Sequence, residues 1–215
     1  MSGLVDSAVR EPANETKFYG VAIAEVVSNE DSSGLGRVQL RLPWLSGYQP
    51  WARVAVLAAG QNRGTYFIPQ VGDEVLVAFN HGDVREPFVV GALWNGRDKP
   101  PRTGTLDPAA TRVIRTPAGH EIEFDDTKQS IVVLTCTGQK LAMDPDHVEI
   151  SAGNGAAKLT LTTAGDVTVE AMNIRWNATA TLEAKGNIVN VNGDANATFK
   201  GGGLCTVQGG LVKIN

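Results

Sequence analysis

Apolar and polar residues alternate along much of the first hundred residues, which is the pattern of half-buried β-strands. In the segment 36–44, Val38, Leu40 and Leu42 share one face, and arginine and glutamine side chains occupy the other. Gly, Asn and Pro residues separate this segment from others of the same kind. The five segments predicted as strands are 18–29, 36–44, 51–59, 73–80 and 86–94.

No helical pattern lies between these segments. Five short strands in about eighty residues favour a small closed barrel of the OB type over a β-sandwich, which usually has about seven strands. A closed barrel also leaves no exposed sheet edge. We therefore predict an all-β N-terminal barrel.

The last sixty residues have a different pattern, in which single apolar anchors recur every seven or eight residues. The anchors are Leu159, Val167, Ile174, Leu182, Val189, Ala197, Leu204 and Val212. Most are followed two positions later by a second apolar residue, and Gly, Asn, Asp or Lys residues lie between the pairs. A unit of this size buries too little surface to be stable alone, so stacked units must supply the core.

Three chains wound around one axis, each giving a short strand per unit, fit this spacing. The alternatives are a single-chain solenoid, whose usual repeat of about twenty residues or strict hexapeptide is not visible, and a disordered polar tail, in which regular anchors are not expected. The sequence therefore predicts an intertwined triple-stranded β-helix in a homotrimer. The residues predicted to fill its axis are Leu159, Val167, Val169, Ile174, Trp176, Leu182, Val189, Val191, Phe199, Leu204, Val212 and Ile214.

Several stretches resemble a known family. "GRVQLRLPW", "IPQVGDEVLVAF", "PFVVGALWN" and "TPAGHEIEFDDT" are similar to the baseplate assembly protein V and VgrG-type spike family of contractile phage tails and injection systems. The resemblance extends over roughly residues 18–130, and it implies an OB barrel joined to a triple-stranded β-helix. The positions that carry the barrel signature are Pro69, Gly72, Asp73, Gly82 and Gly91.

These observations divide the chain into four predicted parts. Residues 1–17 form an N-terminal extension, 18–97 the barrel, 98–112 a proline-containing linker and 113–215 the shaft. All ten prolines lie at or before Pro145, and 151–215 has none, as expected where every backbone donor is paired.

Charge and composition restrict the classes of molecule that this chain is expected to bind. The net charge of −4 argues against a generic nucleic-acid binder. One cluster nevertheless has the composition of a base-stacking platform: Arg37, Arg41 and Arg53 near Trp44, Tyr48 and Trp51. We favour a solvated face or a protein interface at this cluster. The N-terminus has no secretory pattern and no apolar run is long enough to span a membrane, so we expect synthesis in the cytoplasm and assembly into an injection particle.

Catalytic and metal-binding motifs are not visible. His81, His120 and His147 are isolated, and Cys136 and Cys205 fit no metal or redox spacing, so we expect no cofactor and two buried or idle thiols. Asp73 and Glu74 point to opposite faces of a strand, which does not suit paired acid–base work. We expect His120 to pack where the barrel gives way to the shaft.

The leading functional hypothesis is a structural spike. The resemblance implies a homotrimer that meets a baseplate hub through the barrel, carries a PAAR-type protein at its C-terminal end, and contacts the target membrane only when driven through it. Two alternatives remain. One is a tail-associated peptidoglycan hydrolase, for which the linker is too short to hold a catalytic domain; the other is an OB-type binder of nucleic acid or glycan.

Overall fold

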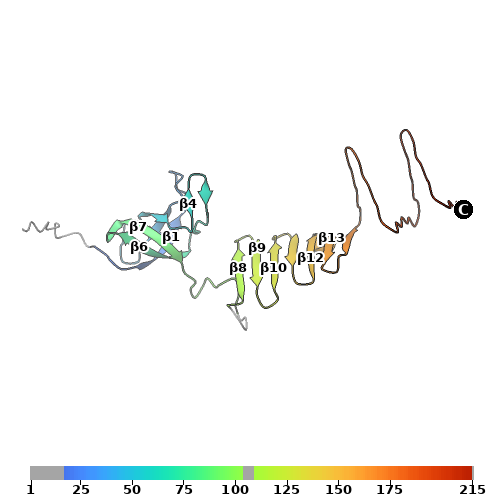
Figure 1. Cartoon of the computed structure of the whole chain (residues 1–215). Coiled ribbons are helices and arrows are strands. Elements are labelled where there is room, and N and C mark those ends of the chain that lie inside the picture. The colour runs from blue at the N-terminus through green and yellow to red at the C-terminus, as the bar shows by residue number, and fades with distance from the viewer. Residues whose placement is uncertain (1–16, 104–108, 215) are drawn as a thin grey trace, which may run out of the picture.

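The fold is all-β, and its strands form a closed barrel followed along the chain by one long sheet (Figure 1). The structure is a computed structural model, and it describes residues 17–103 and 109–214. The predicted N-terminal extension therefore lies outside the described residues, apart from Lys17. No helix among the described residues is long and apolar enough to cross a membrane.

Five strands close the barrel in the order β1-β2-β3-β7-β6. All neighbours are antiparallel except β3 and β7, which are parallel. The strands are β1 (Ala22–Ser28), β2 (Val38–Arg41), β3 (Trp51–Val54), β6 (Glu74–Asn80) and β7 (Asp83–Ala92). The predicted closed barrel of five strands is confirmed.

The barrel core consists of the inward members of each alternating strand. Val26, Val38, Leu40, Val75 and Val77 are fully buried, whereas their neighbours along each strand reach solvent. The face predicted to carry Val38, Leu40 and Leu42 is thus the buried one. Small residues on β1 and β3, such as Ala24 and Ala52, leave room for these branched side chains.

Three predicted strands are too long, because β1, β2 and β3 are shorter than the segments 18–29, 36–44 and 51–59. The segment 51–59 was expected to be extended throughout, but β3 ends at Val54, and the chain then forms a small two-stranded ribbon of β4 (Ala59–Gly60) and β5 (Arg63–Gly64). Gly64 explains the ribbon. Its φ is 144°, and a Cβ atom at this position would lie 2.3 Å from the Ala58 carbonyl oxygen, so no other residue fits.

Two of the signature glycines, Gly72 and Gly82, lie in turns and have positive φ. His81 and Gly82 both have positive φ, 47° and 79°, which is the geometry of a tight type I′ hairpin joining β6 to β7. Gly72 has a φ of 95° in the turn before β6, and the Asp73 carboxylate closes that turn by accepting from the Gln70 N–H at 2.8 Å. Gly91 lies in β7 with open space around it, and nothing in the structure explains a glycine there.

The second part of the chain is a seven-stranded antiparallel meander, β8 to β14 in sequence order. Its strands are β8 (Thr111–Arg115), β9 (Glu121–Asp125), β10 (Ser130–Leu134), β11 (Lys140–Met143), β12 (His147–Ala152), β13 (Ala157–Thr162) and β14 (Val167–Ala171). A 3-10 turn, η1 (Gly153–Gly155), joins β12 to β13.

The meander differs from the sequence-based expectation in two respects. It begins at Thr111, inside the segment predicted as linker, and its strands pair with one another within one chain. β13 and β14 are antiparallel, and Leu159 lies opposite Val169. Short turns such as 163–166 reverse the chain locally, which a regular anchor spacing does not reveal.

Residues 172–214 contain neither helix nor strand, and every one of them is exposed in the single chain. Figure 1 shows this segment as an extended zigzag beyond β14. Bends interrupt it at 179–180, 187–188, 194–195, 202–203 and 210–211, that is, every seven or eight residues.

Candidate functional site

The seven-stranded sheet has one face that is almost wholly apolar. Cross-strand pairing places one residue from each strand in a central row along the sheet: Ile114, Ile122, Val133, Leu141, Ile150, Leu159 and Val169. A parallel row beside it contains Arg112, Phe124, Ile131, Met143, Val148, Leu161 and Val167. Thirteen of these fourteen side chains are apolar, and we call this surface the apolar face.

The apolar face is not covered within the described chain. Ile150 is 50% exposed, Val167 66% and Val169 46%, and Figure 1 shows no second layer packed on this sheet. A single sheet cannot bury such a face by itself, and contiguous exposed apolar surface of this kind marks an interaction site.

The opposite face of the sheet is mostly polar and carries several ion pairs, with Val113, Val132, Leu134 and Ala142 as its apolar members. Lys158 and Glu170 approach to 3.0 Å, and Lys140 and Glu149 to 3.5 Å. At the β8–β9 end, the Arg102 guanidinium binds Glu121 and Glu123, and these hydrogen bonds raise the pKa of Arg102. The sheet is therefore two-sided, with one mostly polar face and one exposed apolar face.

The residues predicted for the trimer axis fall into two groups. Leu159, Val167 and Val169 lie on the apolar face of β13 and β14. The remaining members lie in the extended segment, where Trp176 is 67% exposed and Phe199 73%; this group is Ile174, Trp176, Leu182, Val189, Val191, Phe199, Leu204, Val212 and Ile214.

Sequence reasoning missed the part of the apolar face that lies on β8 to β12. Residues such as Ile122, Phe124, Ile131 and Val133 alternate with polar neighbours, so the period-two pattern was present. The pattern does not repeat at a fixed spacing, because the chain reverses direction at each turn of an antiparallel sheet. The sequence separation between successive central-row residues therefore varies with the length of the turn between them.

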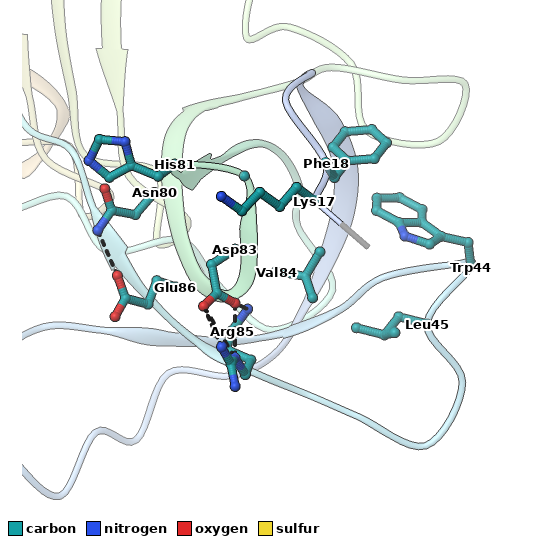
Figure 2. A pocket seen from close by; sticks show the side chains of 11 residues that line it. Lys17, Phe18, Trp44, Leu45, Asn80, His81, Asp83, Val84, Arg85 and Glu86 are labelled. Atoms are coloured by element: carbon teal, nitrogen blue, oxygen red, sulfur yellow. Dashed lines mark hydrogen bonds and ion pairs between the residues drawn. The ribbon is translucent and has the colours of Figure 1, made fainter. Parts of the chain in front are cut away.

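A second candidate site is a groove on the barrel at the β6–β7 turn (Figure 2). The ring of Phe18 stacks on that of Trp44 with centroids 5.4 Å apart and meets Phe79 edge-on at 5.5 Å. Leu45 and Val84 extend this apolar wall, as Figure 2 shows.

Charged groups of both signs lie along the rim of the groove. The Arg85 guanidinium binds the Asp83 carboxylate at 2.8 Å, and this side-chain hydrogen bond lowers the pKa of Asp83 to about 2. Glu86 accepts a hydrogen bond from the Asn80 amide at 2.6 Å. These charged and polar side chains are paired with one another, so the groove presents an aromatic wall beside a set of hydrogen-bonded polar groups.

Two of the three arginines that lie near Trp44, Tyr48 and Trp51 in the sequence have acidic partners. Arg37 binds Asp31 at 2.9 Å, which anchors the loop before β2, and Arg41 binds Glu25. Arg37 also lies over the Trp51 ring at 5.6 Å, and Arg53 lies over Phe88 at 5.5 Å. Two of the three guanidinium charges are thus engaged within the barrel surface, which disfavours phosphate binding there.

The isolated histidines and cysteines also have defined surroundings. Both thiols are free and exposed, so of the two expected alternatives, buried or idle, the buried one is wrong. His120 lies in the turn between β8 and β9, where its Nδ1 accepts a hydrogen bond from the Cys136 N–H at 3.3 Å. Over residues 17–103 and 109–214 there is no group of three or more His, Cys, Asp or Glu side chains arranged to hold a metal.

Two family descriptions match this chain, one for each part of the fold. Residues 22–94, the barrel, match the type VI secretion system/phage-baseplate injector OB domain. Residues 111–175, which include the whole sheet, match the phage baseplate V C-terminal trimerisation domain.

Curated relatives are similar over part of their length. The chain is 28% identical over 157 residues to the type VI secretion system spike protein VgrG3 of Vibrio cholerae, covering 65% of this chain and 15% of that protein. It is 30% identical over 132 residues to the actin cross-linking toxin VgrG1 of the same species, covering 54% and 12%. With spike protein VgrG2a of Pseudomonas aeruginosa, identity is 30% over 106 residues, covering 45% and 13%.

This chain therefore spans about an eighth to a seventh of each of these relatives. Because both its barrel and its apolar-faced sheet are matched in order, the chain belongs to the phage baseplate V and VgrG-type spike family of contractile injection systems.

Proposed function

We propose that this chain acts as a homotrimeric central spike in which three sheets close into a triangular prism with their apolar faces inward. The observation that carries the proposal is the apolar face itself, thirteen apolar side chains in two continuous rows on a sheet with no second layer among the described residues. Three walls would bury these rows against one another, and the polar faces with their ion pairs would remain in water.

The direction of the rows suits a rod. The strands run across the wall and the rows run along it, so the seven strands, spaced by about 4.8 Å, give a prism of about 29 Å between the first and last strands. The seven strands of the wall pair in sequence order within one chain, so each copy supplies one complete wall of the proposed prism.

Beyond β14 we propose that the three chains intertwine as a triple-stranded β-helix. The extended segment 172–214 has no backbone partner for its strand-like stretches, and unpaired backbone groups need partners once they are buried. Its bends recur every seven or eight residues, which supports straight edges joined by corners around a threefold axis.

Glycines at the corners support the same arrangement. Gly193 and Gly201 each precede a bend, and a Cβ atom there would lie 2.5 Å and 2.4 Å from the carbonyl oxygens of Asn196 and Leu204. Gly186 precedes the bend at 187–188 in the same way, with the Ile188 oxygen at 3.1 Å. These close approaches recur at the spacing of the corners, as a repeated turn of one type requires.

The proposed spike has a partner at each end. We assign hub attachment to the barrel, whose projecting segment around β4 and β5 carries the exposed side chains of Leu57, Tyr66 and Phe67. The C-terminal end of the shaft would receive a PAAR-type tip, and sheath contraction would drive the assembly through a target envelope. The chain is then a mechanical component rather than an enzyme, made in the cytoplasm and incorporated into the baseplate.

Sedimentation equilibrium at micromolar concentration tests the central claim. The expected mass is three times that of the 22.7-kDa chain. A stable monomer over that range would overturn the proposal. Electron microscopy of the purified protein should then show a rod projecting from a ring of three barrels; a globular particle would contradict the shaft.

A further inference from the structure

The two borders of the apolar face differ in side-chain size. On β12 to β14, one border consists of three alanines paired across the sheet, Ala152, Ala157 and Ala171. The other border, on the far side of the central row, consists of Val148, Leu161 and Val167. We call these the alanine border and the branched border.

The alanine border opens onto a shallow hollow of about 540 Å³. The three alanines and the central-row side chains of Ile150, Leu159 and Val169 line most of it, and Thr135 and Gln139 lie at its β10–β11 end, so its walls are mainly apolar. An apolar hollow many times larger than the roughly 30 Å³ of one water molecule is poorly suited to ordered water and well suited to hydrocarbon side chains.

Threefold symmetry determines which surface can enter this hollow. In a closed cyclic trimer each interface is heterologous, so one border of a wall always meets the opposite border of the next wall. We propose that in the trimer the branched border of each copy inserts into the hollow over the alanine border of its neighbour. This inference rests on the proposed homotrimer and adds the residues that interlock at each corner of the prism.

Size and exposure both support the interlock. Leu161 is 40% exposed and Val167 66% in the single chain, so both have surface left to bury. Pairing like borders would leave the alanine hollows empty and crowd the branched side chains, and both an unfilled cavity and an overpacked contact cost stability.

Charge favours the same pairing. The turn beside the branched border carries Asp144 and Asp146, whereas the turn beside the alanine border, Gly153–Gly155, is uncharged. A heterologous corner therefore brings an acidic turn towards a neutral one, and a corner made of two branched borders would bring like charges together. The Lys158 and Glu170 side chains, which approach to 3.0 Å, alternate along β13 and β14 with the residues of the apolar face and so belong to the outer face.

Cysteine cross-linking tests the interlock in the full chain. In a background in which Cys136 and Cys205 are changed to serine, Ala157→Cys and Leu161→Cys are combined on β13. These two positions lie about 14 Å apart along one strand, so they cannot form a disulfide within a chain, which needs Cα atoms roughly 4.4–6.8 Å apart. Mild oxidation should shift the chain on a non-reducing gel from its 22.7-kDa position to that of a covalent trimer.

The matched control combines Lys158→Cys and Thr162→Cys, which have the same spacing on the same strand but belong to the outer face. It should stay monomeric on the gel. A second interlock pair, Val167→Cys with Ala171→Cys on β14, repeats the test if the first variant does not fold.

The outcomes separate the interlock from the trimer. Sedimentation of the serine background as a trimer, with cross-linking of the border pairs alone, supports the proposal. A sedimenting trimer whose border pairs cross-link no better than the outer-face control overturns the interlock and leaves the trimer standing. A monomeric background overturns both.

Discussion

A charge placed on the apolar face should dissociate the trimer, whereas the same charge one residue away should not. Val169 and Thr168 are adjacent on β14 and face opposite sides of the sheet. Val169→Asp and Thr168→Asp therefore introduce the same carboxylate into the same strand, with the same change in net charge. The main difference between them is the face of the sheet that receives the charge.

The size of the effect follows from exposure. Val169 is 46% exposed in the single chain, and burying a valine completely is worth about 1.5 kcal/mol, so closing the prism gains about 0.7 kcal/mol from this side chain per chain and about 2 kcal/mol per trimer. A buried unpaired carboxylate costs several kcal/mol more in each chain. The sum is on the order of 10 kcal/mol per trimer, or about seven powers of ten in the dissociation equilibrium.

Sedimentation velocity across a micromolar concentration series measures this directly. Val169→Asp should sediment as a monomer where wild type and Thr168→Asp sediment as trimers, and Val169→Asn should have an intermediate effect because it buries a polar group without a full charge. Circular dichroism of the monomer should retain the β signal of the barrel and the meander. If both aspartate variants remain trimeric with equal thermal stability, the apolar face is not the trimer interface and the reasoning fails.

Three further results are expected. Leu40→Ala removes a fully buried barrel side chain and should lower the free energy of unfolding by about 2–5 kcal/mol in a urea titration. The control Arg41→Ala breaks an exposed ion pair and should change that free energy by no more than about 1 kcal/mol. Equal losses in the two variants would contradict the assigned core. Gly201→Ala should lower the melting temperature and protease resistance of the shaft, because its Cβ would lie 2.4 Å from the Leu204 oxygen, while Gly202→Ala, with nothing within 4 Å, should resemble wild type. Hydrogen bonds from Arg85 lower the pKa of Asp83 to about 2, so the contribution of Asp83 to barrel stability is present above about pH 4 and is lost as the pH falls towards 2. Asp83→Asn should therefore flatten that part of the curve of unfolding free energy against pH. An unchanged curve would show that the Asp83–Arg85 pair does not stabilise the barrel.

The barrel was predictable because its information is local. Alternation along β2 and β6 assigns each side chain to the core or to solvent, and the turn at His81 and Gly82 requires positive φ that the sequence signals with glycine. Each of these features depends on residues within one hairpin. The sequence pattern did not predict the end of β3 at Val54. The two-stranded ribbon that follows depends on the close approach of Gly64 to the Ala58 carbonyl oxygen, a contact between the two strands of the ribbon.

The sequence predicted the apolar repeat only in part. The sequence by itself determined that the last sixty residues carry regularly spaced apolar anchors without a core of their own, because anchor spacing is a property of one chain read along its length. Only the tertiary structure decided that β8 to β14 form an antiparallel meander whose two rows make one continuous apolar face, with alanines on one border and branched side chains on the other. The physical reason is that strand direction and register are determined by turns and cross-strand hydrogen bonds, and the same spacing is compatible with parallel or antiparallel neighbours until those bonds are placed.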